Sequence, residues 1–188
     1  MAYFPMYRDM DTLKVLVVGG GHIAAEKLEK LLDFTQAITI IALRVEEETQ
    51  KLIDTHKVTL YQRAYKVGDI EDFDIVIVAT DTTEIHKSIY EESRESRILV
   101  NSVDNTEYCD FIFPSYVKKG DLTVSFSTAG ASPAFAKKMR QHFEKIIPDS
   151  VEMFLEKMRH LRTTMPKGKE RMAHFDRLVK NYFSQHFK

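Results

Sequence analysis

Three consecutive glycines follow an apolar run near the N-terminus, in the stretch Val18-Gly-Gly-Gly-His-Ile-Ala24. Gly19, Gly21 and Ala24 fit the pattern Gly-x-Gly-x-x-Gly/Ala, in which the first glycine forms a tight turn and the second lets a pyrophosphate approach the backbone. The phosphates would lie on free N–H groups of a helix that begins near Ile23. The pattern predicts dinucleotide binding, and the loop residues expected to contact the cofactor are Gly19, Gly20, Gly21, His22, Ile23 and Ala24.

Two groups of polar residues follow later apolar runs, where the carboxyl ends of parallel strands bind ligands. Thr80 and Asp81 form the first group, and their hydroxyl and carboxylate could line a nucleotide crevice. Asp81 or Thr82 could equally cap the helix that follows. Asp104 belongs to the second group and could act as a general base if burial raises its pKa towards the working pH. The alternative for Asp104 is a turn-forming aspartate in the dipeptide Asp104-Asn105.

The segment Ser127–Pro133 combines small residues with free amide groups just before an expected helix. That arrangement suits a carboxylate or a phosphate, although it is also typical of an ordinary strand-to-helix cap. A basic cluster could receive an acidic substrate or could form a solvated face. Its members are Lys118, Lys119, Lys137, Lys138 and Arg140.

Composition excludes several classes of function. The chain has 188 residues and a net charge of −1, so bulk electrostatics favour neither nucleic acid nor an anionic membrane as a partner. The single cysteine, Cys109, excludes an intrachain disulfide and multi-cysteine metal sites, which fits a cytoplasmic protein. We expect no secretory signal and no membrane helix, because no apolar run approaches about 20 residues. Helical histidines lack a metal-ligand spacing, so no metal site is expected.

Apolar runs alternating with amphipathic segments predict an α/β fold, a Rossmann-type parallel sheet wound by right-handed crossovers. The expected strands cover residues 13–18, 37–42, 58–62, 73–79 and 97–101. Helices are expected between them, including residues 24–34, 46–56 and the segment up to residue 93. We therefore expect residues 1–113 to form a nucleotide-binding domain.

The pattern changes after residue 113. Two strands joined at Lys119-Gly-Asp121 predict a β-hairpin, followed by a helix that Ser132 and Pro133 begin and that ends before Pro148. Residues 114–147 are expected to form a small dimerisation segment, because a hairpin and a helix are too small to fold alone. Residues 148–188 are expected to form a C-terminal helical region, broken at residues 166–168.

With these segments in order, the chain resembles the precorrin-2 dehydrogenase family, also called the siroheme-synthase N-terminal module. The resemblance rests on the order and spacing of several short motifs and not on one of them. These motifs are Phe4-Pro5-Met6, Val18-Gly-Gly-Gly-His-Ile-Ala24 with Lys27, Ala79-Thr80-Asp81, Asn101-Ser-Val-Asp104, Phe111-Ile-Phe-Pro-Ser115 and Ser132-Pro133.

The resemblance implies a homodimeric, NAD-binding enzyme in which precorrin-2 loses a hydride to the nicotinamide and a proton to a base, yielding sirohydrochlorin. Asp104 falls at the family's catalytic aspartate. Some members also insert iron, so ferrous ion is a second possible substrate and Asp104 could serve that reaction too. Cations and a helix N-terminus would hold the carboxylates of the tetrapyrrole. The residues expected to bind substrate are Asn101, Ser127, Thr128, Gly130, Ser132, Lys137 and Lys138.

The second expected strand ends in Ile41-Ala42-Leu43-Arg44, without the acidic residue that usually holds the ribose hydroxyls. Arg44 could face a 2′-phosphate, which would favour NADP, or it could point to solvent. NAD is expected on the resemblance. Two rival functions remain open: a nucleotide-sensing regulatory module, which would need neither Asp104 nor the Ser127–Pro133 segment, and a different NAD(P)-dependent oxidoreductase with a small substrate.

Overall fold

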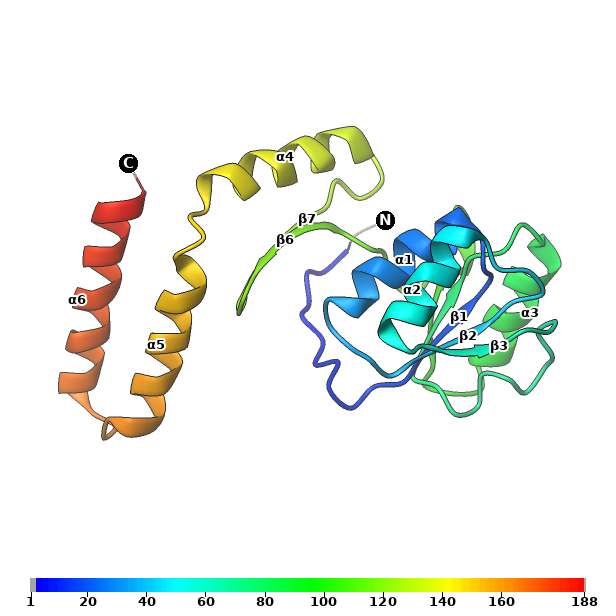
Figure 1. Ribbon diagram of the computed structural model, residues 1–188, viewed down its shortest axis with the longest axis horizontal. Coiled ribbons are helices and arrows are strands. Elements are labelled where there is room, and N and C mark those ends of the chain that lie inside the picture. The colour runs from blue at the N-terminus through cyan, green and yellow to red at the C-terminus, as the bar shows by residue number, and fades with distance from the viewer. Residues whose placement is uncertain (1–2, 188) are drawn as a thin grey trace. The chain divides into compact units, whose positions relative to one another are not determined.

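The computed structural model describes residues 3–187, and its elements are labelled in Figure 1. The chain divides into two compact units, which are described separately. One unit is Pro5–Ile112, and the other is built from the chain after Ile112, joined by Tyr3 and Phe4. Within the described residues, no helix is both long enough and apolar enough to cross a membrane.

The first unit contains a five-stranded parallel sheet in the order β3-β2-β1-β4-β5. Val18, at the end of the central strand, pairs with Ile41 on one side and Val78 on the other. This arrangement confirms the predicted α/β class and its parallel sheet. The strands are β1 (Val15–Val18), β2 (Ile38–Ile41), β3 (Thr59–Tyr61), β4 (Ile75–Val78) and β5 (Leu99–Ser102).

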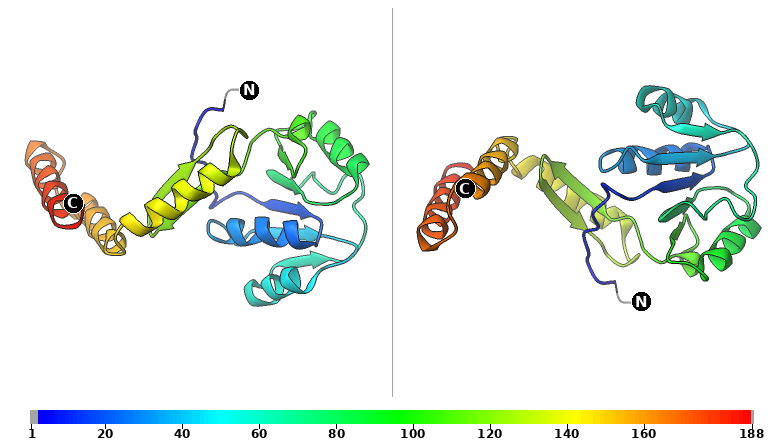
Figure 2. Two further views of the ribbon diagram at one scale, coloured as in Figure 1. Left: turned by 90° about the horizontal axis from the view of Figure 1, so that it is seen from above. Right: turned by 90° about the horizontal axis from the view of Figure 1, so that it is seen from below.

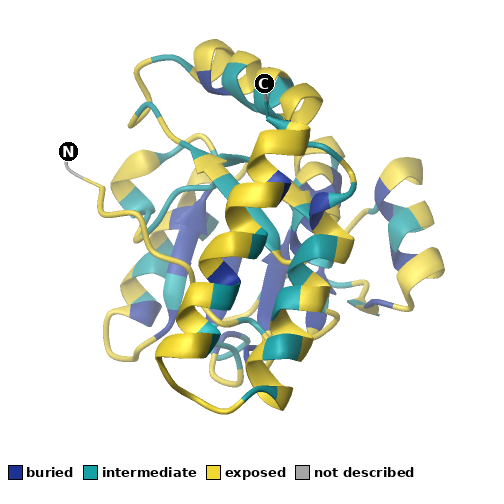
Figure 3. Cartoon of the chain, turned by 90° about the vertical axis from the view of Figure 1, so that its left-hand side faces the viewer, coloured by how far each residue is buried: buried dark blue, intermediate teal, exposed yellow. Residues whose placement is uncertain are grey.

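Helices cover both faces of this sheet. Helices α1 (His22–Leu32) and α2 (Glu47–His56) lie on one face, and α3 (Thr83–Ser93) lies on the other (Figure 1). Every residue of β1 and β4 is buried, as expected of continuous apolar strands between two helix layers. In Figure 3 these strands are coloured as buried, whereas the helices of the chain carry largely exposed surfaces.

The strand order reverses between β1 and β4, because the chain leaves β1 towards one edge of the sheet and leaves β4 towards the other. Loops therefore diverge at the carboxyl ends of these two strands, where open α/β sheets bind their ligands. The glycine loop follows β1, and Thr80 and Asp81 follow β4. The fold thus brings two of the predicted segments to the same edge of the sheet.

The second unit begins with an antiparallel hairpin of β6 (Ser115–Lys119) and β7 (Leu122–Phe126). Gly120 occupies the turn with a positive φ of 55°, where glycine is favoured. Helix α4 (Pro133–Ile146) packs against the hairpin, as the two further views in Figure 2 show. The predicted hairpin and the predicted start of this helix are both present.

Helices α5 (Val151–Thr164) and α6 (Lys169–His186) complete the second unit and are separated at residues 166–168, as expected. Their shared core contains Val117, Ile147, Val151 and Tyr182, and the Tyr182 ring stacks on Phe154 with centroids 4.2 Å apart. This core forms because each amphipathic element buries its apolar side against the others. The hairpin therefore shares a core with the helices that follow it in the same chain.

Candidate functional site

Two glycines of the loop are required by the protein's own packing. Gly19 has a φ of 126°, and a Cβ placed on it would lie 2.0 Å from the carbonyl oxygen of Ala79. A Cβ on Gly20 would lie 2.3 Å from the carbonyl oxygen of Arg44. A side chain at either position would therefore push apart the segments that follow β1, β2 and β4.

Gly21 differs from its neighbours, because a Cβ there would meet only the Glu46 carboxylate at 3.5 Å, an ordinary contact. Gly21 is also the N-cap of α1, and no side chain caps this helix. The first N–H groups of the helix thus lack a side-chain cap and lie next to a residue without a side chain. This cradle fits a phosphate group, since a helix N-terminus combines N–H donors with a positive dipole end.

The segment between β2 and α2 wraps around the glycine loop. The Glu46 N–H donates to the Gly20 carbonyl at 2.8 Å, and the buried Thr49 hydroxyl donates to the Gly21 carbonyl at 3.1 Å. The sequence analysis identified Arg44 here but missed Glu46, whose carboxylate lies nearest Gly21. Arg44 is exposed. The run of three acids at Glu46–Glu48 was the signal that could have drawn attention to this position.

His22 extends from the loop towards α2. Its Nδ1 lies 2.8 Å from a carboxylate oxygen of Glu48, and both side chains are exposed. The hydrogen bond and negative charge of Glu48 raise the pKa of His22 above its ordinary value. The glycine loop therefore carries one titratable group whose charge depends on a neighbouring helix.

A cavity of about 240 Å³ lies at the carboxyl ends of β4 and β5. Its walls include Ile23 from α1, Thr80 and Asp81 after β4, His86 from α3 and Asp104 after β5. The structure therefore brings three of the predicted cofactor residues, Ile23, Thr80 and Asp81, and the predicted catalytic aspartate to one cavity. Because ligand pockets usually measure roughly 300–1,000 Å³, this space suits one end of a ligand more than a whole large one.

Asp104 lies at the rim of this cavity with its side chain exposed and with a φ of 60°. The left-handed backbone is uncommon for residues other than glycine, although aspartate and asparagine tolerate it best. The sequence argument made burial of Asp104 a condition for a raised pKa, and the structure does not meet this condition, so the role of Asp104 stays a prediction. The carboxylate is open to solvent because the chain turns away from the sheet immediately after β5.

Lys27 is a neighbour of Asp104. The sequence analysis named Lys27 beside the glycine motif but did not include it among the expected site residues. Only 15% of its side chain is exposed. Burial lowers the pKa of the Lys27 ammonium, and Lys30 lowers it further, while the carboxylates of Glu26 and Asp104 act in the opposite direction. Because the Asp104 carboxylate acts on the pKa of Lys27, the carboxylate and the ammonium lie in one neighbourhood. The signal in the sequence was a lysine three residues after Ala24, beside the buried stripe of α1.

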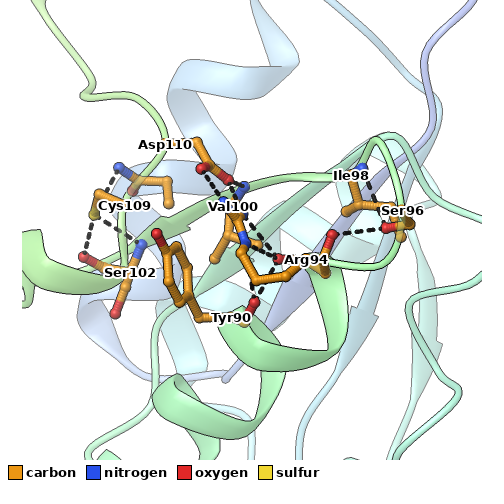
Figure 4. Close-up of polar contacts among 10 residues, drawn as sticks. Tyr90, Arg94, Ser96, Ile98, Val100, Ser102, Cys109 and Asp110 are labelled. Carbon is orange, nitrogen blue, oxygen red and sulfur yellow. Dashed lines mark hydrogen bonds and ion pairs between the residues drawn. The ribbon is translucent and has the colours of Figure 1, made fainter.

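The segment after β5 is held in place by polar contacts, which Figure 4 shows. Asp110 accepts hydrogen bonds from the Val100 N–H at 2.8 Å and from the Arg94 guanidinium at 2.8 and 2.6 Å. Cys109 accepts from the Ser102 N–H at 3.2 Å and donates to the Ser102 carbonyl at 3.1 Å. These contacts close the loop around the short helix η1 (Thr106–Tyr108) and so support Asp104. Burial raises the pKa of the Cys109 thiol.

Residues 6–115 match the family model whose description is "Putative NAD(P)-binding". The chain belongs to this NAD(P)-binding family. The match covers the whole first unit from the residue after Pro5, including the glycine loop and Asp104. It extends only to Ser115, so α4, α5 and α6 lie outside the NAD(P)-binding family domain.

Several curated relatives carry the name siroheme synthase. The relative from Pseudoalteromonas atlantica is 38% identical over 162 residues, which are 85% of this chain and 35% of the relative. The relative from Zymomonas mobilis is 30% identical over 188 residues, which are 98% of this chain and 40% of the relative. The chain thus spans between a third and two fifths of the length of these relatives.

A solved structure named SirC, precorrin-2 dehydrogenase, has the same fold as this chain. The two superpose with a TM-score of 0.82, and the match covers 98% of this chain and 91% of the other at 24% identity. The similarity extends over the NAD(P)-binding family domain and the helices that follow it.

Outside the cofactor loop, the predicted substrate residues have roles within the protein. Asn101 is buried, and its amide donates to the Phe111 carbonyl at 2.8 Å. Ser132 caps α4 by accepting from the Phe135 N–H at 3.2 Å, so the ordinary capping role considered for this segment is present. Substrate binding by these residues remains a prediction.

The remaining predicted substrate residues belong to the second unit. The hydroxyl groups of Ser127 and Thr128 accept backbone hydrogen bonds from Ala129 and Ser132 at 3.1 and 3.0 Å. Gly130, Lys137 and Lys138 are exposed.

Lys119, a further member of the basic cluster, has a role within the second unit. The Lys119 ammonium donates to the Ile147 carbonyl and to Asp149, both at 2.6 Å, and so closes the end of α4. Thr82 is the N-cap of α3 but makes no side-chain capping bond, while Asp81 is exposed. Among the described residues, no three histidine, cysteine, aspartate or glutamate side chains lie together in a way that could hold a metal ion.

Proposed function

We propose that this chain is an NAD-dependent precorrin-2 dehydrogenase that forms sirohydrochlorin in siroheme biosynthesis. The observation that carries the proposal is that Asp104 borders the same cavity as Thr80, Asp81 and the start of α1. A base and a dinucleotide site are the two components that removal of a hydride and a proton requires. The relatives named siroheme synthase and the shared fold with SirC support the choice of substrate.

Gly21 and the first N–H groups of α1 would hold the pyrophosphate of the dinucleotide, because this cradle is open and uncapped. Thr80 and Asp81 would line the crevice beside it. The dinucleotide, when bound, supplies the hydride acceptor.

Glu46 supports NAD over NADP. Its carboxylate lies beside Gly21, where it would accept a hydrogen bond from a ribose hydroxyl and repel a 2′-phosphate. Arg44 is exposed and two residues away. The choice is tested by comparing KM for NAD and NADP in the wild type, Glu46→Gln and Arg44→Gln. A lower KM for NADP in the wild type would contradict the assignment.

Asp104 would accept the proton that leaves precorrin-2. Its exposed position at the rim lets the carboxylate reach a substrate that covers the cavity. The buried Lys27 ammonium lies in the same neighbourhood as this carboxylate. In the second unit, Lys137, Lys138 and the segment Ser127–Pro133 would hold carboxylates of the tetrapyrrole.

We infer that the protein acts as a homodimer. The hairpin of β6 and β7 is a two-stranded sheet, and unpaired strand edges favour association. Large apolar side chains are exposed on the second unit, namely Phe135, Ile146, Met153, Met172, Val179 and Phe183. A second copy would bury them, and sedimentation equilibrium of the purified chain distinguishes a dimer from a monomer.

The central experiment supplies the purified protein with precorrin-2 and either NAD or NADP and follows sirohydrochlorin by its absorbance. Asp104→Ala should abolish most of the turnover, whereas Asp72→Ala, which removes an exposed carboxylate outside the cavity, should not. Absence of turnover with both nucleotides would exclude the dehydrogenase. Dinucleotide binding without turnover would favour the regulatory module.

Iron insertion into sirohydrochlorin would also need a base, since two pyrrole protons leave as the metal enters. Asp104 is the candidate for that step as well. Adding ferrous ion to sirohydrochlorin in the same cuvette tests whether the chain performs this second reaction, and the Asp104→Ala variant tests whether both reactions share the carboxylate.

A further inference from the structure

His86 is a buried titratable residue beside the cavity, in the first turn of α3, with 5% of its surface exposed. Its Nε2 lies 2.7 Å from the Thr80 carbonyl oxygen. A carbonyl can only accept, so Nε2 donates. In the neutral ring Nδ1 must therefore accept, and its partner is the hydroxyl of Ser102. Both ring nitrogens are thus used within the protein.

The two partners of His86 belong to two segments that each contribute a wall to the cavity, one after β4 and the other at the end of β5. Thr80 follows β4 on the side of the cofactor loop, and Ser102 ends β5 two residues before Asp104. The Val103 N–H donates to the Val78 carbonyl at 2.9 Å, at the end of the ladder that pairs these strands. The imidazole of His86 joins the same two segments through its hydrogen bonds to Thr80 and Ser102.

Helix α3 provides a rigid base for this bridge. Ile89, one turn after His86, is fully buried in the core formed with β4 and β5. An imidazole fixed to an anchored helix, with hydrogen bonds at both nitrogens, has little freedom to move. The His86 side chain, and not the loops alone, therefore sets the distance between the two walls.

We propose that His86 is a positioning residue that holds the Thr80 wall and the Ser102–Asp104 wall in register. The proposal rests on the proposed dehydrogenase, in which the cofactor lies along one wall and the base on the other. Misplacement of reacting groups by roughly 1 Å can reduce a rate about 100-fold, so a fixed separation matters for turnover.

Three variants separate the two hydrogen bonds. Ser102→Ala removes only the bond on the Asp104 side, and we expect kcat to fall about 10-fold with the Kd for NAD unchanged. His86→Asn retains an acceptor for Ser102 but does not reach Thr80, so we expect the Kd for NAD to rise about 10-fold with a smaller change in kcat. His86→Phe loses both bonds and should show both effects.

A double variant and a control distinguish positioning from general destabilisation. Adding Ser102→Ala to His86→Phe should reduce kcat no further, because the interaction is already absent. Ile89→Val destabilises the same helix without touching either wall and should leave kcat and Kd unchanged. Equal losses of kcat and of affinity in Ser102→Ala, His86→Asn and Ile89→Val, in step with their melting temperatures, would overturn the proposal.

Hydrogen exchange followed by mass spectrometry needs neither substrate nor cofactor. His86→Phe should speed exchange in residues 79–83 and 102–106, and Ser102→Ala should speed it only in residues 102–106. If the wild type fails to oxidise precorrin-2, the proposed function is wrong, and this exchange pattern still decides whether His86 links the walls. Unchanged exchange in His86→Phe would refute the link even in an active enzyme.

Discussion

The glycine loop after β1 and the aspartate loop after β5 follow the carboxyl ends of strands in one sheet but are held by different means. Gly19 and Gly20 are fixed by backbone atoms that approach within 2.0–2.3 Å of where a Cβ would lie. Asp104 is supported instead by side chains, including Cys109 and Asp110. The first loop presents backbone N–H groups and tolerates few substitutions, whereas the second presents one side chain and tolerates change at that side chain.

This difference predicts that mutations in the two loops separate stability from chemistry. A side chain at Gly19 or Gly20 alters the structure first and binding as a consequence. A change at Asp104 alters the reaction with little effect on folding, because its carboxylate is exposed.

Asp104→Asn should have the largest effect. We expect turnover of precorrin-2 to fall about 1,000-fold, since general base catalysis contributes about 10²–10⁴-fold. The melting temperature should change little, because asparagine tolerates a φ of 60° as well as aspartate does. Steady-state kinetics and a thermal melt measure the two quantities. Retention of more than about a tenth of the wild-type kcat would contradict the role of a base.

Gly19→Ala and Gly21→Ala form a matched pair within the glycine loop. Gly19→Ala should lower the free energy of unfolding by more than about 3 kcal/mol, because the Cβ would overlap the Ala79 carbonyl at a strained φ. Gly21→Ala should leave the free energy of unfolding nearly unchanged but weaken dinucleotide binding about 10-fold. Urea unfolding and a dinucleotide titration compare them. Equal dinucleotide affinity in Gly21→Ala and wild type would argue against the phosphate cradle.

Asp110→Asn tests the side-chain support of the second loop. The substitution weakens two charge-assisted bonds from Arg94 and should lower the free energy of unfolding by about 2 kcal/mol. Turnover should also fall because Asp104 loses its support. Urea unfolding and kinetics provide the measurement, with Asp72→Asn as the control at an exposed site. Full turnover in a destabilised Asp110→Asn would show that the position of Asp104 does not depend on this support.

The smallest effect is expected at His22, whose contribution to the stability of the fold depends on pH. Glu48 raises the pKa of His22 in the folded state, so their interaction stabilises the fold below the unfolded pKa near 6.5 and is lost as the pH rises through the higher folded value. Glu48→Gln should return the pKa of His22 to its ordinary value, measured by NMR titration of the imidazole. An unchanged pKa in that variant would show that the helix contact does not control this group.

Local patterns in the sequence predicted most of the elements. The apolar runs that became β1 and β4 are buried on both faces, and the Ser132-Pro133 pair begins α4 as its cap chemistry requires. These predictions succeed because periodicity and capping depend on residues a few positions apart. Burial of Asp104 could not be judged in this way, since exposure depends on where the chain turns after β5.

The sequence by itself determined the fold class, the glycine loop and the candidate base, because each is a short pattern of residue types. Only the tertiary structure decided which residues surround them. Glu46 lies beside Gly21, Lys27 is near Asp104, and His86 joins Thr80 to Ser102, which lies 16 positions after His86 in the chain. Parallel strands bring their carboxyl ends to one edge of the sheet, and that geometry, not spacing along the chain, creates these contacts.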